Sequence, residues 1–235
     1  MKNYTHLNTY RYERKFVGNN MPRAVAEMIV KQNRAFFVAV FHPRQVNNIY
    51  FDTPGLDCYF DNLFGVAKRW KARVRWYDNQ FGNIDSPVLE FKLKQGHTGT
   101  KKSFQLPSFK IDKNNFNAAH WKKIFGEASL PEEITEKLSG LQPVLLNSYL
   151  RSYFTTVNKE FRITVDDRLE YFNLRPSWNI LIHKHKEVFK TVVELKYDTA
   201  LDSKAAEITN QFPFRLDKNS KFVSGMSHFR SAIAE

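Results

Sequence analysis

The stretch that decides the fold is residues 69–77, which read Arg69-Trp-Lys-Ala-Arg-Val-Arg-Trp-Tyr77. Basic and apolar residues alternate along it, and successive side chains of a β-strand point to opposite faces. The alternation predicts a strand with one apolar face and one face of four cations. Like charges about 4 Å apart repel by about 4 kcal/mol near a protein surface. A concave basic face would therefore bind a multiply charged anion, whereas a flat one would be ordinary solvated surface.

The composition narrows the class of partner. The chain has 235 residues, 42% of them hydrophobic, and carries 36 Lys+Arg against 24 Asp+Glu, a net charge of +12. This balance indicates a polyanionic partner: nucleic acid, an anionic membrane surface or a phosphate-rich small molecule. The single cysteine, Cys58, excludes an internal disulfide, and no run approaches 18 apolar residues. We expect a cytoplasmic protein without a transmembrane segment in this chain.

The alternation of the first stretch recurs along the chain, and no linker or repeat interrupts it. One domain over residues 1–235 is expected, because this length suffices for one sizeable core. Strands are predicted at residues 11–16, 46–51, 69–77, 88–94, 101–106, 145–154, 160–166 and 191–197. Helices are predicted at residues 24–36, 56–62, 115–139 with a break near 130, 201–211 and 216–233.

The charged faces of these strands fit two architectures. An open antiparallel sheet would bury its apolar face and show the charged face to water. A closed barrel would instead turn the charged face inward and be covered by helices. A Glu-x-Lys pattern recurs on three strands, at Glu13/Lys15, Glu90/Lys92 and Glu194/Lys196. Three such pairs beside several arginines favour closure, but the residues alone leave both architectures open.

Several segments, in their order along the chain, carry a family resemblance. They include Arg11-Tyr-Glu-Arg-Lys-Phe16, Ile49-Tyr-Phe-Asp-Thr-Pro54, Lys71-Ala-Arg-Val-Arg-Trp-Tyr77, Leu89-Glu-Phe-Lys92, Val193-Glu-Leu-Lys-Tyr197 and Lys218-Asn-Ser-Lys-Phe-Val-Ser-Gly-Met226. Together they resemble the catalytic domain of the vacuolar transporter chaperone (VTC) polyphosphate polymerases. This family is part of the triphosphate tunnel metalloenzyme superfamily, which also includes the CYTH phosphohydrolases.

The resemblance implies an α+β fold built on an eight-stranded antiparallel β-barrel, the triphosphate tunnel. Its interior would be polar and basic, and helices would cover its outside. The implied activity moves the terminal phosphoryl group of ATP to inorganic phosphate or a growing polyphosphate chain. Such transfer depends on positioning the reactants and on neutralising charge over the phosphoryl oxygens.

The motifs also carry the family's site residues onto this chain. The resemblance implies catalytic roles for Lys15, Arg73, Arg75, Arg151 and Glu194. It implies phosphate binding by Arg11, Lys92, Lys101, Tyr149, Arg162, Lys196, Lys218, Ser220 and Lys221. Glu194, with Glu13 as a second candidate, would bind Mn²⁺ or Mg²⁺, since hard divalent cations prefer oxygen ligands.

One departure from the superfamily favours the polymerase branch. The CYTH hydrolases carry Glu-x-Glu-x-Lys on the first strand, whereas this chain has Arg11-x-Glu13-x-Lys15. Losing a carboxylate and gaining a cation weakens a two-metal site and strengthens polyanion binding. This sequence also shows neither the SPX domain nor the transmembrane segments of membrane-bound family members, so coupling of synthesis to export is not implied.

Three other functions differ from this one in the acceptor or in the ligand. An inorganic triphosphatase or nucleotide phosphohydrolase would use water as acceptor on the same scaffold. A non-catalytic module would bind polyphosphate without turnover. A nucleic-acid partner is disfavoured, because a tunnel admits a thin linear polyanion and excludes a duplex.

Two local assignments depend on strand register. Lys101 is placed toward the tunnel in preference to Lys102. His183 and His185 flank Lys184 on a predicted strand. A metal pair is one interpretation of these histidines, and exposed residues of an edge strand are the preferred one.

Overall fold

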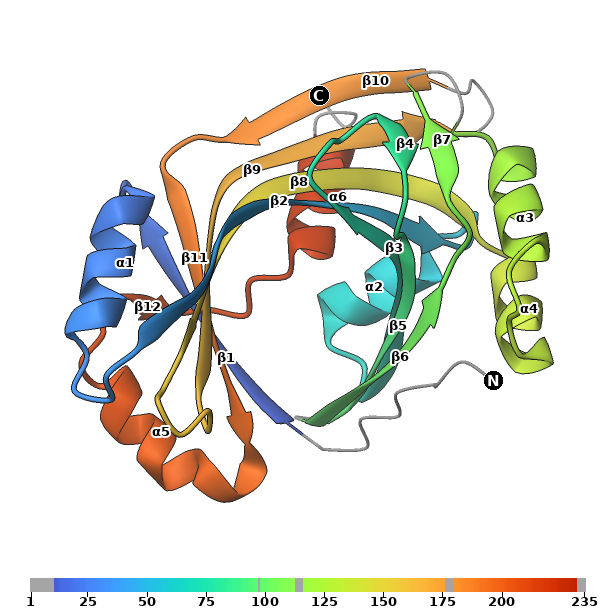
Figure 1. Cartoon of the computed structure of the whole chain (residues 1–235). Helices are drawn as coiled ribbons and strands as arrows, with labels where there is room; N and C mark the ends of the chain where they lie inside the picture. Colours follow the sequence, from blue (N-terminus) through green and yellow to red (C-terminus); the bar gives the residue numbers. More distant parts are fainter. Residues whose placement is uncertain (1–10, 97, 113–115, 176–179, 232–235) are drawn as a thin grey trace.

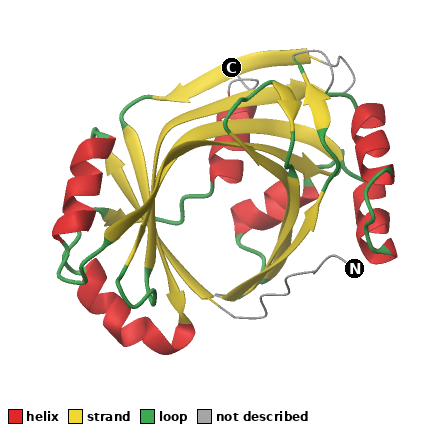
Figure 2. Ribbon diagram, viewed as in Figure 1, coloured by secondary structure: helices red, strands yellow, loops and turns green. Residues whose placement is uncertain are grey.

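The computed structural model describes residues 11–96, 98–112, 116–175 and 180–231. Long antiparallel strands form a strongly curved sheet, and helices pack against both of its faces (Figures 1 and 2). The fold is α+β, as predicted, with six α-helices among the described residues.

The main sheet contains ten strands. They are β1 (Arg11–Asn19), β2 (Val38–Asp52), β3 (Lys68–Tyr77), β5 (Val88–Gln95), β6 (Thr98–Gln105), β8 (Gln142–Thr155), β9 (Arg162–Arg175), β10 (Ile180–Glu187), β11 (Lys190–Asp198) and β12 (Arg215–Leu216). A separate pair joins β4 (Gly82–Ile84) to β7 (Phe109–Ile111).

The helices lie between these strands along the chain. They are α1 (Arg23–Gln32), α2 (Asp57–Phe64), α3 (Ala118–Gly126), α4 (Glu132–Ser139), α5 (Asp202–Thr209), which follows the short 3-10 helix η1 (Thr199–Leu201), and α6 (Lys221–Ser231).

The order of the strands bears on whether the sheet is a barrel. Eight strands follow one another as β9-β11-β1-β6-β5-β3-β2-β8, and β8 also pairs with β9. Among the described residues, however, the β1–β6 seam consists of one residue pair, Arg11 opposite Gly99. Strands β10 and β12 lie off this series, on β9 and β1. The large antiparallel sheet is confirmed, whereas the expected closed eight-stranded barrel is not established.

The two faces of β3 separate as the alternation predicted. Ala72, Val74 and Trp76 are buried in an apolar cluster with residues of α3 and α4, on the outside of the curved sheet. A second outer cluster joins α1 and α5 to strands β1, β9 and β11. Burying these faces fixes the register, because a slip of one residue would exchange apolar and charged side chains. The charged face of β3 is thereby turned inward.

The inner face is not polar throughout, which corrects the expectation that helices cover only the outside. Helices α2 and α6 pack against inner-face side chains such as Leu145 and Tyr171. Helix α2 contributes Tyr59 to this cluster, and α6 contributes Phe222 and Met226. Helix α6 lies so close to the sheet at Gly225 that an added Cβ atom would stand 2.6 Å from the Tyr171 ring. This apolar plug fills one part of the interior and places the start of α6 beside the charged part.

Several elements extend beyond their predicted bounds. Strand β2 begins at Val38, although only residues 46–51 carry the predicted pattern. Residues 38–44 are largely exposed, and apolar and polar residues do not alternate along them, so their strand character comes from pairing with β8. The last helix begins at Lys221 and not at residue 216, because residues 215–216 pair with β1 as β12.

Candidate functional site

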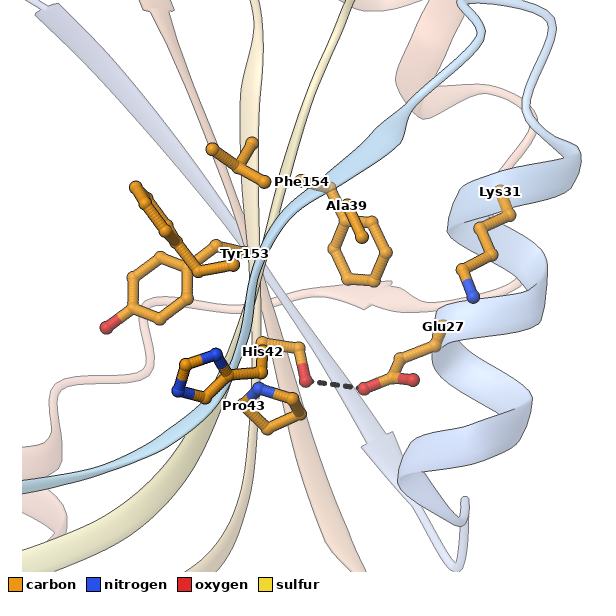
Figure 3. A pocket seen from close by; sticks show the side chains of 10 residues that line it. Glu27, Lys31, Ala39, His42, Pro43, Tyr153 and Phe154 are labelled. Atoms are coloured by element: carbon orange, nitrogen blue, oxygen red, sulfur yellow. Dashed lines mark hydrogen bonds between the residues drawn. The ribbon is translucent and has the colours of Figure 1, made fainter. Parts of the chain in front are cut away.

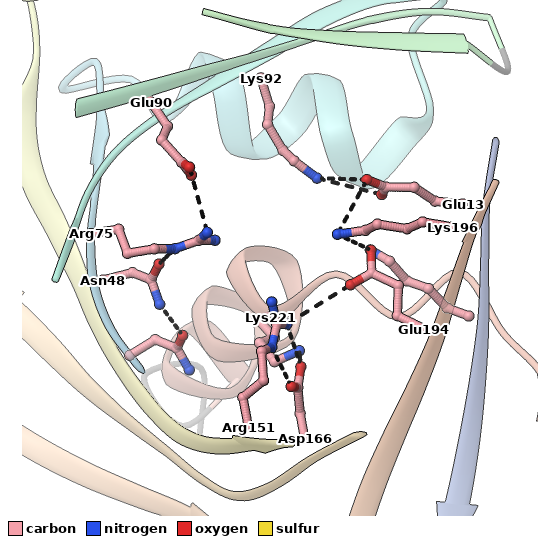
Figure 4. Close-up of polar contacts among 12 residues, drawn as sticks. Glu13, Asn48, Arg75, Glu90, Lys92, Arg151, Asp166, Glu194, Lys196 and Lys221 are labelled. Atoms are coloured by element: carbon pink, nitrogen blue, oxygen red, sulfur yellow. Dashed lines mark hydrogen bonds and ion pairs between the residues drawn. The ribbon is translucent and has the colours of Figure 1, made fainter. Parts of the chain in front are cut away.

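The inner face holds a narrow basic pocket of about 70 Å³ in front of the start of α6 (Figure 4). It is lined by side chains from six strands and from the segment that opens α6: Lys15, Tyr50, Lys71, Arg73, Arg75, Lys92, Tyr149, Arg151, Glu194, Lys196, Asn219, Ser220 and Lys221. Eight of these residues are cations and one is a carboxylate. Carboxylates in and around the lining hold the cations in three groups.

The first group is centred on Glu90 of β5, which is 3% exposed. Its carboxylate accepts from Arg73 at 2.6 Å, from Lys101 at 2.8 Å and from Arg75 at 3.4 Å. Burial disfavours the charged form of Glu90, but Arg73 and Lys101 outweigh burial and lower its pKa to about 2. Glu90 therefore stays ionised and fixes both guanidinium groups on the inner face.

The Glu90 group also settles the register of β6. Lys101 reaches Glu90 on the inner face, whereas Lys102 contacts Glu133 of α4 at 3.4 Å on the outer face. The preference for Lys101 as the inward residue is confirmed.

The depressed pKa of Glu90 makes stability depend on pH. Its folded-state pKa of about 2 lies below the ordinary value of 4.5, so its contribution is present above pH 4.5 and is lost as the pH falls toward 2. The contribution is roughly 3 kcal/mol by linkage. We expect urea unfolding to show wild type more stable than Glu90→Gln at neutral pH, with the gap narrowing below about pH 4. A gap independent of pH would contradict this assignment.

The second group is centred on Asp166 of β9, which is fully buried. Arg151 donates to it in a two-pronged contact at 2.6 and 2.7 Å, and Lys221 donates at 2.6 Å. Burial favours the neutral form of Asp166, but Arg151 and Lys221 overcome this and keep its pKa below the ordinary value. Asp166 thus ties the first residue of α6 to the sheet.

The third group is centred on Glu194 of β11. Lys196, Arg151 and Lys15 approach its carboxylate at 3.5, 3.8 and 3.9 Å. Burial opposes its ionisation, but the surrounding cations, Lys196 and Lys15 foremost, hold its pKa well below the ordinary value. Glu194 is therefore a permanent anion in the pocket.

Glu13 of β1 extends this third group across the seam between β1 and β6. It accepts from Lys92 of β5 at 3.1 Å and lies 3.8 Å from Lys196. The contact joins the two sides of the seam, where the backbone of the described part of the chain contributes one residue pair.

Lys71 of β3 shows that the pocket carries surplus positive charge. Its ammonium group donates to the Ser220 hydroxyl at 2.7 Å, and among the described residues no carboxylate lies within ion-pair distance of it. Burial, together with Lys15, Lys92 and Arg73, lowers the pKa of Lys71 well below its ordinary value. A half-buried ammonium among other cations is stabilised by an anion, so the pocket is suited to a polyanionic ligand.

Most of the predicted site residues converge on this pocket. Those that line it are Lys15, Arg73, Arg75, Lys92, Tyr149, Arg151, Glu194, Lys196, Ser220 and Lys221, and Lys101 and Glu13 contact its members. Tyr149 lies with its ring beneath the charges of Arg151 and Lys221, at 5.0 and 4.6 Å.

Two predicted residues lie elsewhere, and one falls outside the described side chains. Arg162 and Lys218 are exposed and do not line the pocket. Arg11 pairs in β1 with Asp198, but its side chain lies outside the described part of the structure.

Five residues of the site were not among the predicted ones. Glu90 belongs to the Glu-x-Lys pattern that recurs on three strands, but no site role was predicted for it. Lys71 stands in the same alternating row as Arg73, so the signal was present in the sequence. Asp166 likewise shares the polar face of its strand. Tyr50 and Asn219 had no comparable signal, because their roles depend on how β2 and the start of α6 meet.

The carboxylates offer limited ligands for a metal. Within the described ranges, no three His, Cys, Asp or Glu side chains gather in a group that could hold an ion. Glu194 and Glu13 both lie near Lys196, so the protein supplies two carboxylates at one side of the pocket. A hard divalent cation fits this donor set where phosphate oxygens complete the coordination.

The two histidines of β10 lie apart from these carboxylates in the sequence. The His183 side chain lies outside the described residues, and the His185 ring stacks on the His228 ring with 3.5 Å between the ring centroids.

A larger cavity lies on the outer side of the sheet but does not suit a polyanion. This groove of about 500 Å³ runs between α1 and strands β2 and β8, and Ser152 donates there to Glu27 (Figure 3). Its lining is mostly apolar, with Phe41 and Phe154 beside one Lys and one Glu. The basic pocket is therefore the candidate functional site.

With this geometry established, the chain can be compared with known proteins. The family model of the VTC domain matches residues 6–230. This chain belongs to the VTC domain family. No curated protein matches it, and no helix of the described VTC domain is long and apolar enough to span a membrane.

Two solved structures match this chain, and the first of them shows a likeness in fold. One is a candidate adenylyl cyclase from Hippeastrum with a dominant triphosphatase activity; it is 13% identical, with a TM-score of 0.52, over 94% of this VTC domain and 96% of that chain. The other is a candidate adenylate cyclase from Bacillus halodurans, 14% identical with a TM-score of 0.48, over 90% of this chain and 94% of that one.

Proposed function

We propose that this VTC domain is a polyphosphate polymerase, which transfers the terminal phosphoryl group of ATP to inorganic phosphate or to a polyphosphate chain in the basic pocket. The observation that carries the proposal is the surplus of positive charge in the pocket. Its lining has eight cations and one carboxylate, and within the described ranges Lys71 has a hydroxyl and an aromatic ring as partners but no carboxylate. A row of phosphates would neutralise this surplus.

The arrangement suits phosphoryl transfer, in which the protein positions phosphates and stabilises their charge. Arg73 and Arg75 are held by Glu90, and Arg151 is held by Asp166, so their guanidinium groups are fixed before a ligand arrives. Fixed guanidinium groups bind phosphate oxygens in a two-pronged manner without paying for their own ordering. These three arginines are proposed to bind the phosphates on both sides of the transferred group.

The cofactor is proposed to bind on the side that carries Glu13 and Glu194, across the pocket from Arg75 and Glu90 (Figure 4). Glu194, with Glu13 beside it, would hold Mn²⁺ or Mg²⁺ together with the substrate's phosphates. Such an ion supplies further neutralisation of the phosphoryl oxygens. Lys15 and Lys196 keep Glu194 ionised, which is the form that a metal requires.

The acceptor distinguishes the proposal from its alternatives. The Hippeastrum protein has a dominant triphosphatase activity, so a hydrolase with water as acceptor is the second candidate. The test is incubation of the purified protein with ATP and Mn²⁺. Chains resolved on a gel and degraded by an exopolyphosphatase support the polymerase, whereas orthophosphate alone supports the hydrolase. Tight polyphosphate binding with neither product would indicate a binding module.

Arg73→Ala is expected to weaken binding of tripolyphosphate by about 1.5–3 kcal/mol, the range for a hydrogen bond to a charged group. This corresponds to roughly 10- to 150-fold in the dissociation constant. Isothermal titration calorimetry in metal-free buffer measures it. Lys102→Ala is the control, because it removes one positive charge from the outer face of the same sheet. Equal effects of the two variants would mean that the binding follows net charge and not this pocket.

A further inference from the structure

The basic face continues past the pocket in a regular pattern. Strands β3 and β5 place Lys71 directly opposite Lys92, and one step further along the same face they place Arg69 opposite Lys94. Like charges directly opposite each other destabilise an antiparallel pair. Two such pairs in succession therefore lower the stability of the sheet unless an anion lies across them.

The outer pair belongs to the same face as the pocket. Same-face neighbours on a strand lie about 7 Å apart, so Arg69 and Lys94 form the next row after Lys71 and Lys92. Burial and the charges of Arg69 and Lys15 lower the pKa of Lys94. Because this row follows Lys71 and Lys92, which line the pocket, Arg69 and Lys94 lie at its rim.

The compensation of charge also changes from row to row. Arg73 lies opposite Glu90 and is neutralised by it. Lys92 has Glu13, whereas within the described ranges neither Arg69 nor Lys94 has a carboxylate at ion-pair distance. Arg69 instead donates to the backbone oxygen of Val66 at 2.6 Å. Uncompensated positive charge thus increases from the centre of the pocket to this rim.

We propose that Arg69 and Lys94 form an outer phosphate subsite, which binds the part of a linear polyphosphate chain that extends beyond the three phosphates held in the pocket. This inference rests on the proposed function and narrows its ligand class to chains longer than triphosphate. Arg69 and Lys94 are proposed as specificity residues for chain length, not as catalytic residues.

The test compares two ligands on one double variant. Arg69→Gln with Lys94→Gln is titrated calorimetrically with tripolyphosphate and with a defined linear polyphosphate several times longer, in metal-free buffer at one ionic strength. We expect the affinity for the long chain to fall about tenfold or more, since two charged contacts are lost. The variant should retain most of its affinity for tripolyphosphate, which also shows that it is folded.

A matched control separates a subsite from long-range electrostatics. The double variant Lys102→Gln with Lys137→Gln removes the same number of positive charges from the outer side of the sheet, where both residues contact Glu133. It should leave the preference for the long chain unchanged. Equal losses for the two ligands, equal effects of the two double variants, or no loss at all would overturn the subsite. A different outcome would separate the two proposals. If the wild type makes no polymer from ATP but the double variant still loses affinity for the long chain selectively, the polymerase is overturned and the subsite stands.

Discussion

Glu194→Gln is expected to reduce turnover of ATP by at least about 100-fold, the scale seen when a group that stabilises the transition state is removed. The affinity for tripolyphosphate in metal-free buffer should stay the same or rise. Among the described residues Glu194 is the one carboxylate that lines the pocket, so its loss removes repulsion of phosphate while leaving Lys15, Lys196 and Arg151 in place. The combination of lost turnover and retained binding is the signature of a metal-binding carboxylate.

The measurement pairs a turnover assay over a range of Mn²⁺ concentrations with calorimetric binding of tripolyphosphate in EDTA. Glu170→Gln is the matched control, because this glutamate of β9 pairs with Lys184 and Lys186 away from the pocket. Turnover of Glu194→Gln at the wild-type level would remove the metal assignment. Loss of both turnover and binding would mean that Glu194 organises the pocket and does not act on a metal.

Asp166→Ala is expected to destabilise the fold by about 3–5 kcal/mol, the cost of leaving buried charges without their partner. Asp166 is fully buried, and its two oxygens are shared between Arg151 and Lys221. For a chain of this size the loss corresponds to a fall in Tm of roughly 6–20 °C. The variant should also bind phosphate more weakly, because Lys221 at the start of α6 is no longer held against the sheet.

Thermal unfolding with and without tripolyphosphate tests this expectation. The ligand should recover part of the lost Tm, since phosphate oxygens can pair with the cations that Asp166 leaves. Glu133→Ala, an exposed carboxylate with two lysine partners, serves as control and should leave Tm unchanged. A Tm of Asp166→Ala equal to that of wild type would show that Arg151 and Lys221 reach other partners or water.

The inner and outer faces could be predicted from the sequence because alternation follows directly from strand geometry. Buried Val74 and Trp76 on one face of β3, and Arg73 and Arg75 on the other, lie as the pattern requires. The polar residues on several strands then had to meet once the apolar faces were covered from outside.

Alternation fixes the face of a residue but not its height along the strand. Arg162 shares the polar face of β9 with Asp166, yet it lies at the exposed start of the strand, beyond the pocket. The pairing of β8 with β9 also shifts between Ser148 and Leu150, and Arg168 has a positive φ of 52°. Such irregularities set which inward residues reach one another, and a period of two contains no information about them.

The placement of α2 and α6 was unpredictable for a different reason. By hydrophobicity alone, the apolar side chains of these helices could be buried equally well against the inner or the outer face of the sheet. The choice depends on small residues at the contact, such as Gly225 against Tyr171, and on charged anchors such as Lys221 on Asp166.

The strict inside–outside alternation of β3 has a consequence for how the protein tolerates changes in chain length. Inserting or deleting one residue within β3 would reverse every later side chain of the strand, turning arginines toward the α3–α4 cluster and tryptophan toward the phosphates. A single substitution alters the contacts of one side chain, whereas an insertion of one residue here exchanges the inner and outer side chains along the rest of the strand. Length variation in relatives of this chain should therefore concentrate in connections such as residues 78–81 and 157–160, where side chains do not have to alternate between two faces.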